Sequence, residues 1–221
     1  MRKKLSELFY ECAFVGNYQT TGNSVNYKFI EEDDSLYIYF EGSNSSTDWM
    51  RNFMFKKRPY KDMEIPYKVH RGFLTAWKEV EDIIINKICE DGEYGYKWKH
   101  ITVVGYSHGG ALAFFAHECV WYWRPDLRLE GLETFAFEGP RVFGGFRIPK
   151  GLRERWELFT LIRTNNDLVT HVPPRLFKYC HAGEMLKVKG DTSLVDNKLP
   201  KCVKSHYPQV VYDALLKYEN N

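Results

Sequence analysis

The feature that most constrains the fold is a short apolar segment that runs through a glycine into a strongly apolar helix. Residues 100–104 read HITVV and are closed by Gly105, and residues 111–123 follow as an apolar segment that stops before Pro125. An apolar run of this length is typical of a strand buried on both faces, as in a parallel sheet. A buried strand joined directly to a helix is the unit from which α/β folds are built.

The rest of the chain predicts an α/β fold whose mainly parallel central sheet is flanked by helices on both faces. Apolar runs and helical spacing alternate along the sequence, which favours parallel strand pairing. No repeat or linker divides residues 1–221, so one domain is expected. The expected strands are 27–30, 35–40, 132–137, 158–162 and 185–188, and the expected helices are 5–12, 73–89 and 205–218.

Composition excludes two kinds of partner. The chain is 44% hydrophobic and 27% charged, with a formal net charge of +2, so no strong attraction to nucleic acid is expected. No apolar run approaches the roughly 20 residues that cross a bilayer. Glu7 and Glu11 interrupt the N-terminal apolar stretch, which favours an amphipathic first helix over a signal peptide.

The cysteines indicate a reducing compartment. There are five, an odd number, at widely spread positions and without a CxxC pair. This usage is typical of reduced, buried thiols, so we expect a cytoplasmic protein. A bridge between Cys180 and Cys202 stays open at this point.

The turn after the buried strand carries a candidate nucleophile. Gly105-Tyr106-Ser107-His108-Gly109 matches G-x-S-x-G, and its position between a strand and a helix is the context in which this pattern forms a nucleophile turn. Ser107 is then expected in a strained backbone conformation that exposes its hydroxyl. The following helix start offers N–H groups to developing negative charge.

A serine hydroxyl needs a base, and the base needs an orienting acid. When the chain order is serine, acid, histidine, only His171, His181 and His206 qualify as the base. We expect His206, which precedes the last helix in a polar stretch. Asp167, just past the strand 158–162, is the expected acid, because reactive groups of such sheets gather at strand ends.

Neighbouring residues leave alternatives open. Glu138 also follows a strand and is a weaker rival for the acid. His171 is expected to line the site, and His181 to be structural. The oxyanion of acyl transfer needs fixed donors, for which we expect the N–H groups of Ser43 and His108.

Several blocks of the chain, in order, resemble the class 3 lipase family, the fungal-lipase-like α/β-hydrolases. The resemblance covers residues from about Tyr27 to Tyr212. Its blocks are Phe40-Glu41-Gly42-Ser43 with Asp48-Trp49, Val69-His70-Arg71-Gly72-Phe73, Gly105 to Ala113, Phe135 to Val142, Asn166-Asp167 with Val172-Pro173-Pro174, and Ser205-His206-Tyr207.

The resemblance implies an α/β-hydrolase fold and a serine hydrolase of carboxylic esters, either an acylglycerol lipase or a carboxylesterase. It implies Ser107, Asp167 and His206 as a catalytic triad, with Ser43 and His108 at the oxyanion hole. Two positions depart from the family pattern, Glu41 where arginine is frequent and His108 where leucine is frequent. An ionisable side chain at His108 suggests an additional pH dependence.

The sequence also predicts the class of substrate and the partners of the protein. A lipid or small-molecule ester is the expected substrate, with no cofactor, metal or nucleotide, because the phosphate-loop, dinucleotide and HExxH patterns are absent. Residues 49–70 are where a lid is expected, and residues 49–60 mix aromatic and basic side chains suited to a lipid surface. The pattern does not specify an oligomeric state. The alternative function is a non-catalytic, lipase-like binding or signalling module.

Overall fold

A seven-stranded sheet forms the centre of the computed structural model, which describes residues 3–21, 25–42, 55–60, 65–195 and 198–221. The first three strands pair antiparallel, and every pairing from the third strand to the last is parallel. In sheet order the strands are β1 (Gln19–Thr21), β2 (Val25–Glu32), β3 (Ser35–Phe40), β8 (His100–Tyr106), β9 (Leu132–Phe137), β10 (Phe159–Thr164) and β11 (Glu184–Val188).

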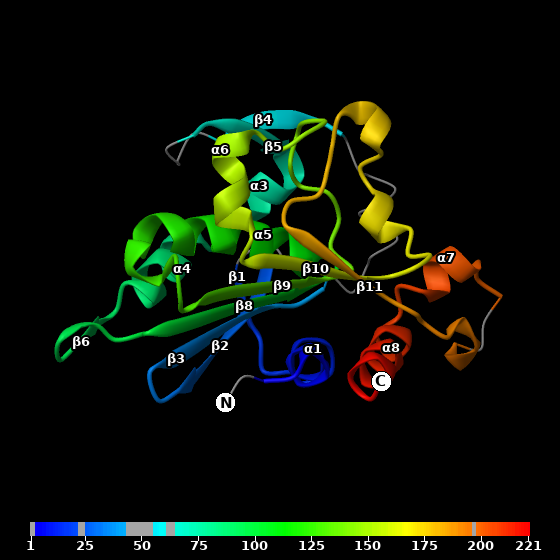
Figure 1. Cartoon of the computed structure of the whole chain (residues 1–221), viewed down its shortest axis with the longest axis horizontal. Coiled ribbons are helices and arrows are strands. Elements are labelled where there is room, and N and C mark those ends of the chain that lie inside the picture. Colours follow the sequence, from blue (N-terminus) through cyan, green and yellow to red (C-terminus); the bar gives the residue numbers. More distant parts are fainter. Residues whose placement is uncertain (1–2, 22–24, 43–54, 61–64, 196–197) are drawn as a thin grey trace.

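Helices cover both faces of this sheet (Figure 1). One face packs against α3 (Arg71–Trp77), α4 (Glu81–Ile88) and α5 (His108–Trp123), and the other against α1 (Leu5–Ala13) and α8 (Pro208–Glu219). Each face has its own apolar core, so the strands between them are buried on both sides. The predicted α/β fold with a mainly parallel sheet and helices on both faces is confirmed.

Smaller elements complete the described part. Two helices of one turn are α6 (Lys150–Arg153) and α7 (Lys201–Lys204). The short strands β6 (Asp91–Gly92) and β7 (Gly95–Tyr96) pair with each other, as do β4 (Lys57–Tyr60) and β5 (Tyr67–His70). Single 3-10 turns lie at Pro125–Leu127, Glu154–Trp156, Val169–His171, Arg175–Phe177 and Thr192–Leu194.

The helix expected over residues 73–89 is two helices, α3 and α4. Between them the N–H groups of Glu79 and Val80 donate to carbonyls three residues back, at 3.1 and 3.0 Å, which tightens the turn. Trp77 and Ile84, one on each side of this turn, are both fully buried. The apolar face was therefore predicted correctly. The spacing of its apolar residues in the sequence is the same with or without the tight turn, so the sequence did not indicate the break.

The pair β4–β5 was not expected and anchors part of the segment in which we looked for a lid. Tyr60 is fully buried against Phe115, with ring centroids 5.4 Å apart. The hydroxyl of Tyr67 donates to the buried carboxylate of Glu118 at 2.7 Å. Arg155 also donates to Glu118, at 3.0 Å, so this charge on α5 is compensated within the core. Residues 49–54 and 61–64 of the expected lid segment lie outside the described residues.

Two further expectations concern the cysteines and membrane-spanning helices. The five thiols are all free, so the open bridge between Cys180 and Cys202 is not formed. Within the described ranges, no helix combines the length and the apolarity needed to cross a bilayer.

The contact between β8 and α5 predicts the effect of a single methyl group. A Cβ at Gly105 would lie 2.1 Å from the carbonyl oxygen of Gly109, which is backbone and cannot turn away. We expect Gly105→Ala to lower the free energy of unfolding by about 1–3 kcal/mol or more. Gly16→Ala is the control, because nothing lies within 4 Å of a Cβ there, and its change should stay within about 0.5 kcal/mol. Urea unfolding of both variants measures the difference, and equal stabilities would contradict the packing of this turn.

Candidate active site

Ser107 occupies the turn between β8 and α5 in a strained conformation. Its φ is 55° and its ψ is −119°, a region in which a residue with a side chain costs about 1–3 kcal/mol. Its N–H donates to the carbonyl of Phe137 at the end of β9, at 2.9 Å. The neighbouring strand thus helps to hold the turn that the sequence predicted.

Two glycines let other backbone segments approach this turn. A Cβ at Gly109 would lie 2.1 Å from the carbonyl oxygen of Phe40, where β3 ends. A Cβ at Gly42, two residues further on, would lie 3.3 Å from the Cβ of Ser107. The chain leaving β3 therefore runs directly beside the serine.

The structure brings Ser107, His206 and Asp167 together. Nε2 of His206 lies 2.8 Å from Oγ of Ser107, and Nδ1 of the same ring lies 2.7 Å from Oδ2 of Asp167. All three side chains are buried, with exposures of 1%, 8% and 0% in the order Ser107, His206, Asp167. The serine follows β8, the aspartate follows β10, and the histidine lies between α7 and α8. A serine, an imidazole and a carboxylate in this order can pass a proton from the hydroxyl to the ring.

The loop that carries Asp167 is tied to its surroundings. Oδ1 of Asp167 accepts the N–H of Val169 at 2.8 Å. The N–H of Leu168 donates to the carbonyl of Cys202 at 3.0 Å, which joins this loop to α7. The carboxylate is therefore fixed from its own loop and from the segment that leads to His206.

His206 is fixed through its backbone as well as through its ring. The hydroxyl of Tyr106 donates to the carbonyl of His206, and the two rings stack with centroids 5.2 Å apart. Sequence reasoning treated Tyr106 only as an unspecified position of G-x-S-x-G. Its role depends on where the C-terminal segment lies, and no local pattern indicates this.

Three buried groups form one electrostatic unit. One carboxyl oxygen of Glu138, one of Asp167 and a ring nitrogen of His206 all lie within 4.8 Å of one another. Burial opposes ionisation of Asp167, but its interactions with Glu138, with His206 and with the N–H of Val169 outweigh it and lower the pKa of Asp167. Burial and the charge of Asp167 raise the pKa of Glu138 well above its ordinary value. A metal ion would have to compete with the hydrogen bond that already joins His206 to Asp167.

The other two candidate bases, His171 and His181, form hydrogen bonds with backbone carbonyl groups. Nδ1 of His171 lies 2.8 Å from the backbone carbonyl of Asp167, and its ring is near Arg163. Nε2 of His181 lies 2.7 Å from the carbonyl of Thr170, and burial lowers the pKa of His181 to about 3. Neither ring takes part in the hydrogen bonds that join Ser107, His206 and Asp167, and the expectations that His171 lines the site and that His181 is structural stay predictions.

Of the two expected oxyanion donors, His108 lies among the described residues. His108 is the first residue of α5, whose N-terminal N–H groups point away from the helix toward the turn. Its imidazole packs against Phe73 at 5.6 Å, and burial lowers the pKa of His108 to about 4. Ser43 and the Asp48-Trp49 block lie outside the described residues.

His70, from the block that resembles a family motif, caps a helix. Nδ1 of His70 accepts the N–H of Phe73 at 3.4 Å, at the start of α3. The side chain is buried. This position explains the histidine without a role in proton transfer.

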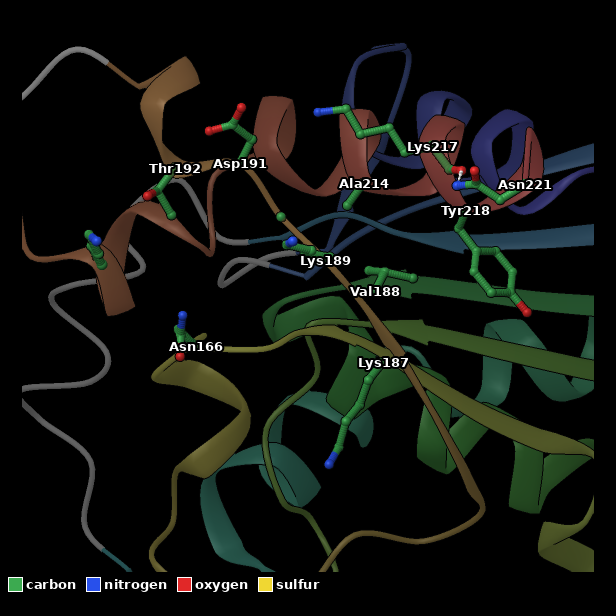
Figure 2. A pocket seen from close by; sticks show the side chains of 12 residues that line it. Asn166, Lys187, Val188, Lys189, Asp191, Thr192, Ala214, Lys217, Tyr218 and Asn221 are labelled. Atoms are coloured by element: carbon green, nitrogen blue, oxygen red, sulfur yellow. Dashed lines mark hydrogen bonds between the residues drawn. The ribbon is translucent and has the colours of Figure 1, made fainter.

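A surface cavity of about 770 Å³ lies next to the loop of Asp167 but does not include Ser107. It is lined by Asn166, the end of β11, α7 and α8 (Figure 2). An acyl chain prefers an apolar lining, so we do not assign this cavity to it. Its charged lining residues are Lys187, Lys189, Asp191, Lys201 and Lys217.

The chain is similar in sequence to fungal lipases. It is 29% identical over 160 residues to a lipase of Rhizomucor miehei, an alignment that covers 70% of this chain and 42% of that protein. It is 26% identical over 169 residues to the secreted mono- and diacylglycerol lipase 1 of Fusarium solani, covering 76% of this chain and 45% of that protein. The chain therefore spans less than half of the length of these curated relatives.

A solved structure and a family model agree with this similarity. The structure of lipase II from Rhizopus niveus superposes with a TM-score of 0.65 and 27% identity, covering 79% of this chain and 67% of that chain. The model of the family described as lipase (class 3) matches residues 37–177. This range contains Ser107 and Asp167, and the fold and the order of the blocks are those expected from the sequence. The chain belongs to the class 3 lipase family, with the α/β-hydrolase fold.

Proposed function

We propose that this chain is a serine hydrolase that cleaves carboxylic esters through an acyl-enzyme intermediate. The observation that carries the proposal is the continuous hydrogen-bonded chain from the hydroxyl of Ser107 through His206 to Asp167. Relatives that are named lipases support the reaction class. The substrate class that fits is a lipid ester such as an acylglycerol, or a smaller carboxylic ester.

Each of these three residues has a proposed role. Ser107 attacks the ester carbonyl while Nε2 of His206 accepts its proton, and the same ring then protonates the leaving alkoxide. Asp167 holds the ring in the useful tautomer and stabilises the imidazolium. Water repeats these steps on the acyl-enzyme, which releases the acid and restores the serine.

Backbone N–H groups stabilise the negative charge of the tetrahedral intermediate. The N–H of His108 at the start of α5 is the first proposed donor, since it directly follows Ser107. The N–H of Ser43 is the second. Gly42 supports this assignment, because a Cβ there would lie only 3.3 Å from the Cβ of Ser107, so the glycine lets the chain after β3 pass close to the serine.

A lipid surface is the proposed partner of the chain segment around residues 49–60. The described end of this segment, Phe55, packs on Phe177 with ring centroids 4.7 Å apart. Phe177 is 46% exposed and the adjacent Leu176 is 84% exposed. Exposed apolar side chains beside Lys57 suit a surface that is apolar with anionic groups.

We propose a reducing compartment, such as the cytoplasm, as the site of action. The free state of all five thiols supports this. Thiol labelling of the denatured protein, taken directly from its source, tests it, and a recovered disulfide would contradict the proposal.

Removing the nucleophile should abolish activity. Ser107→Ala leaves no hydroxyl to form the acyl-enzyme, so turnover of a nitrophenyl ester should fall by about a million-fold. Ser35→Ala is the control, because its hydroxyl is at the opposite end of the sheet, hydrogen-bonded to Asp34. A fluorophosphonate probe should label the parent and Ser35→Ala but not Ser107→Ala. A parent that is neither labelled nor active would favour the alternative of a non-catalytic module.

The imidazole of His108 should not affect activity near neutral pH. Because its pKa is lowered to about 4, the ring is neutral at higher pH and gains a proton only as the pH falls toward that value. Profiles of kcat/KM against pH for the parent and His108→Leu should therefore coincide in shape above about pH 5.5. Any additional inflection in the parent should appear only below that pH. An inflection near pH 6.5 that disappears in His108→Leu would contradict this assignment.

The apolar surface near Phe177 should matter only at a lipid interface. Leu176→Asp should lower hydrolysis of an emulsified long-chain ester by about tenfold, since burying a leucine in an apolar medium is worth about 1.5–3 kcal/mol. Hydrolysis of a dissolved short-chain ester should be unchanged. Leu129→Asp is the matched control, because Leu129 is a leucine of similar exposure, 91%, on another part of the surface. Equal losses in both variants would argue against this contact.

A further inference from the structure

Glu138 occupies an unusual backbone conformation next to the proposed triad. It follows β9 with a φ of 51°, and its side chain is fully buried. Residues other than glycine, asparagine and aspartate rarely adopt this left-handed region. A strained residue of this kind beside a reactive group suggests that its side chain has a functional position.

The contacts of the Glu138 carboxyl differ at its two oxygens. Oε1 accepts the N–H of Thr164 at 2.5 Å. Among the described residues, Oε2 has no N–H or O–H group to accept from, although it is buried. A carboxyl oxygen of Glu138 nevertheless lies within 4.8 Å of one from Asp167 and of a ring nitrogen of His206.

Two buried carboxyl groups this close cannot both be ionised at moderate cost, so the pair holds a proton. Asp167 accepts hydrogen bonds from the N–H of Val169 and from His206, which favour its charged form. Among the described residues, only Thr164 donates to the carboxyl of Glu138, so the proton belongs on Glu138. Protonation turns the unpartnered Oε2 into a donor whose nearest carboxylate is Asp167. Burial and the charge of Asp167 raise the pKa of Glu138, in the same direction.

We propose that Glu138 is a protonated positioning residue, whose Oε2–H donates a hydrogen bond to the carboxylate of Asp167. The inference rests on the proposed function of Ser107, His206 and Asp167. The arrangement becomes a chain of four groups, in which Asp167 is held by three donors. Glu138 does not touch the ester and acts only through Asp167.

The buried phenol and the buried thiol that face this unit from β8 and α1 are neutral. The phenol of Tyr106 approaches Glu138 and Asp167 from β8, and burial raises the pKa of Tyr106 well above its usual value. Cys12 faces Tyr106 from α1, and burial raises the pKa of Cys12 to about 12. Nδ1 of His171 lies 2.8 Å from the backbone carbonyl of Asp167, with Arg163 beside its ring. Among the described residues, the acidic groups next to the ring of His206 are these two carboxyls.

The decisive variant is Glu138→Gln, which keeps an acceptor for Thr164 and a donor for Asp167 but cannot carry charge. The readout is the pKa of His206 from NMR titration of its ring protons, which does not require activity. Since Glu138 is neutral in the parent, this pKa should stay within about 0.3 units in Glu138→Gln, and kcat/KM within about threefold. If Glu138 were ionised, its loss would lower the pKa of His206 by about one unit or more, and the proposal would be overturned.

The second variant, Glu138→Leu, keeps the volume and removes the donor. Without the hydrogen bond from Glu138, the carboxylate of Asp167 interacts more strongly with the ring, so the pKa of His206 should rise by about 0.3 units or more. Because Asp167 is also held less firmly in position, kcat/KM should fall about tenfold or more. Glu138→Met serves in its place if the leucine variant does not fold. Glu184→Gln, on the exposed edge strand β11, controls for loss of a glutamate. Parental values of both readouts in the leucine or methionine variant would show that Glu138 does not position Asp167.

These outcomes separate the two proposals. The NMR titration reports on Glu138 even in a protein that hydrolyses no ester, whereas labelling of Ser107 reports on the hydrolase function. The parent could fail to react with the probe while the pKa of His206 stays unchanged in Glu138→Gln and rises in Glu138→Leu. This result would contradict the hydrolase function but would support the hydrogen bond from Glu138 to Asp167.

Discussion

The close backbone contact between β8 and α5 is the constraint on which the site depends. Without side chains at Gly105 and Gly109, the helix starts against the ends of two strands, and this approach helps to hold Ser107 at a φ of 55°. The serine then points away from the sheet at the edge where β10 also ends. The reactive geometry is therefore a consequence of how a strand and a helix pack, and the strain at one residue is offset by the cores on both faces.

This constraint explains which parts of the molecule were predictable from the sequence. The buried strands and the apolar face of α5 have periodic patterns, and Ser107 is fixed by glycines at set positions around it. Asp167 and His206 follow from chain order and from their location after a strand and before the last helix. Each of these signals is local, or depends only on the order of segments along the chain.

Features that depend on contacts between distant segments were not predictable. The break between α3 and α4 leaves Trp77 and Ile84 buried on its two sides, and the β4–β5 pair places Tyr60 and Tyr67 in the core. Tyr106 holds the backbone of His206 across 100 positions of sequence. No periodicity or motif encodes such a contact, because it arises only when the C-terminal segment has folded over the strand ends.

The different roles of Glu138 and Asp167 were also not predictable from the sequence. Both follow strands that are neighbours in the sheet, so strand position alone makes either one a candidate for the acid. Their hydrogen bonds distinguish them: His206 and the N–H of Val169 contact the carboxylate of Asp167, whereas the N–H of Thr164 is the donor to the carboxyl of Glu138 among the described residues. Adjacent strand ends thus brought two acids into one buried site, where sharing a proton lets one remain charged. A position that sequence reasoning treated as a competitor of Asp167 is, in space, its neighbour, and the charge on Asp167 depends on Glu138 having none.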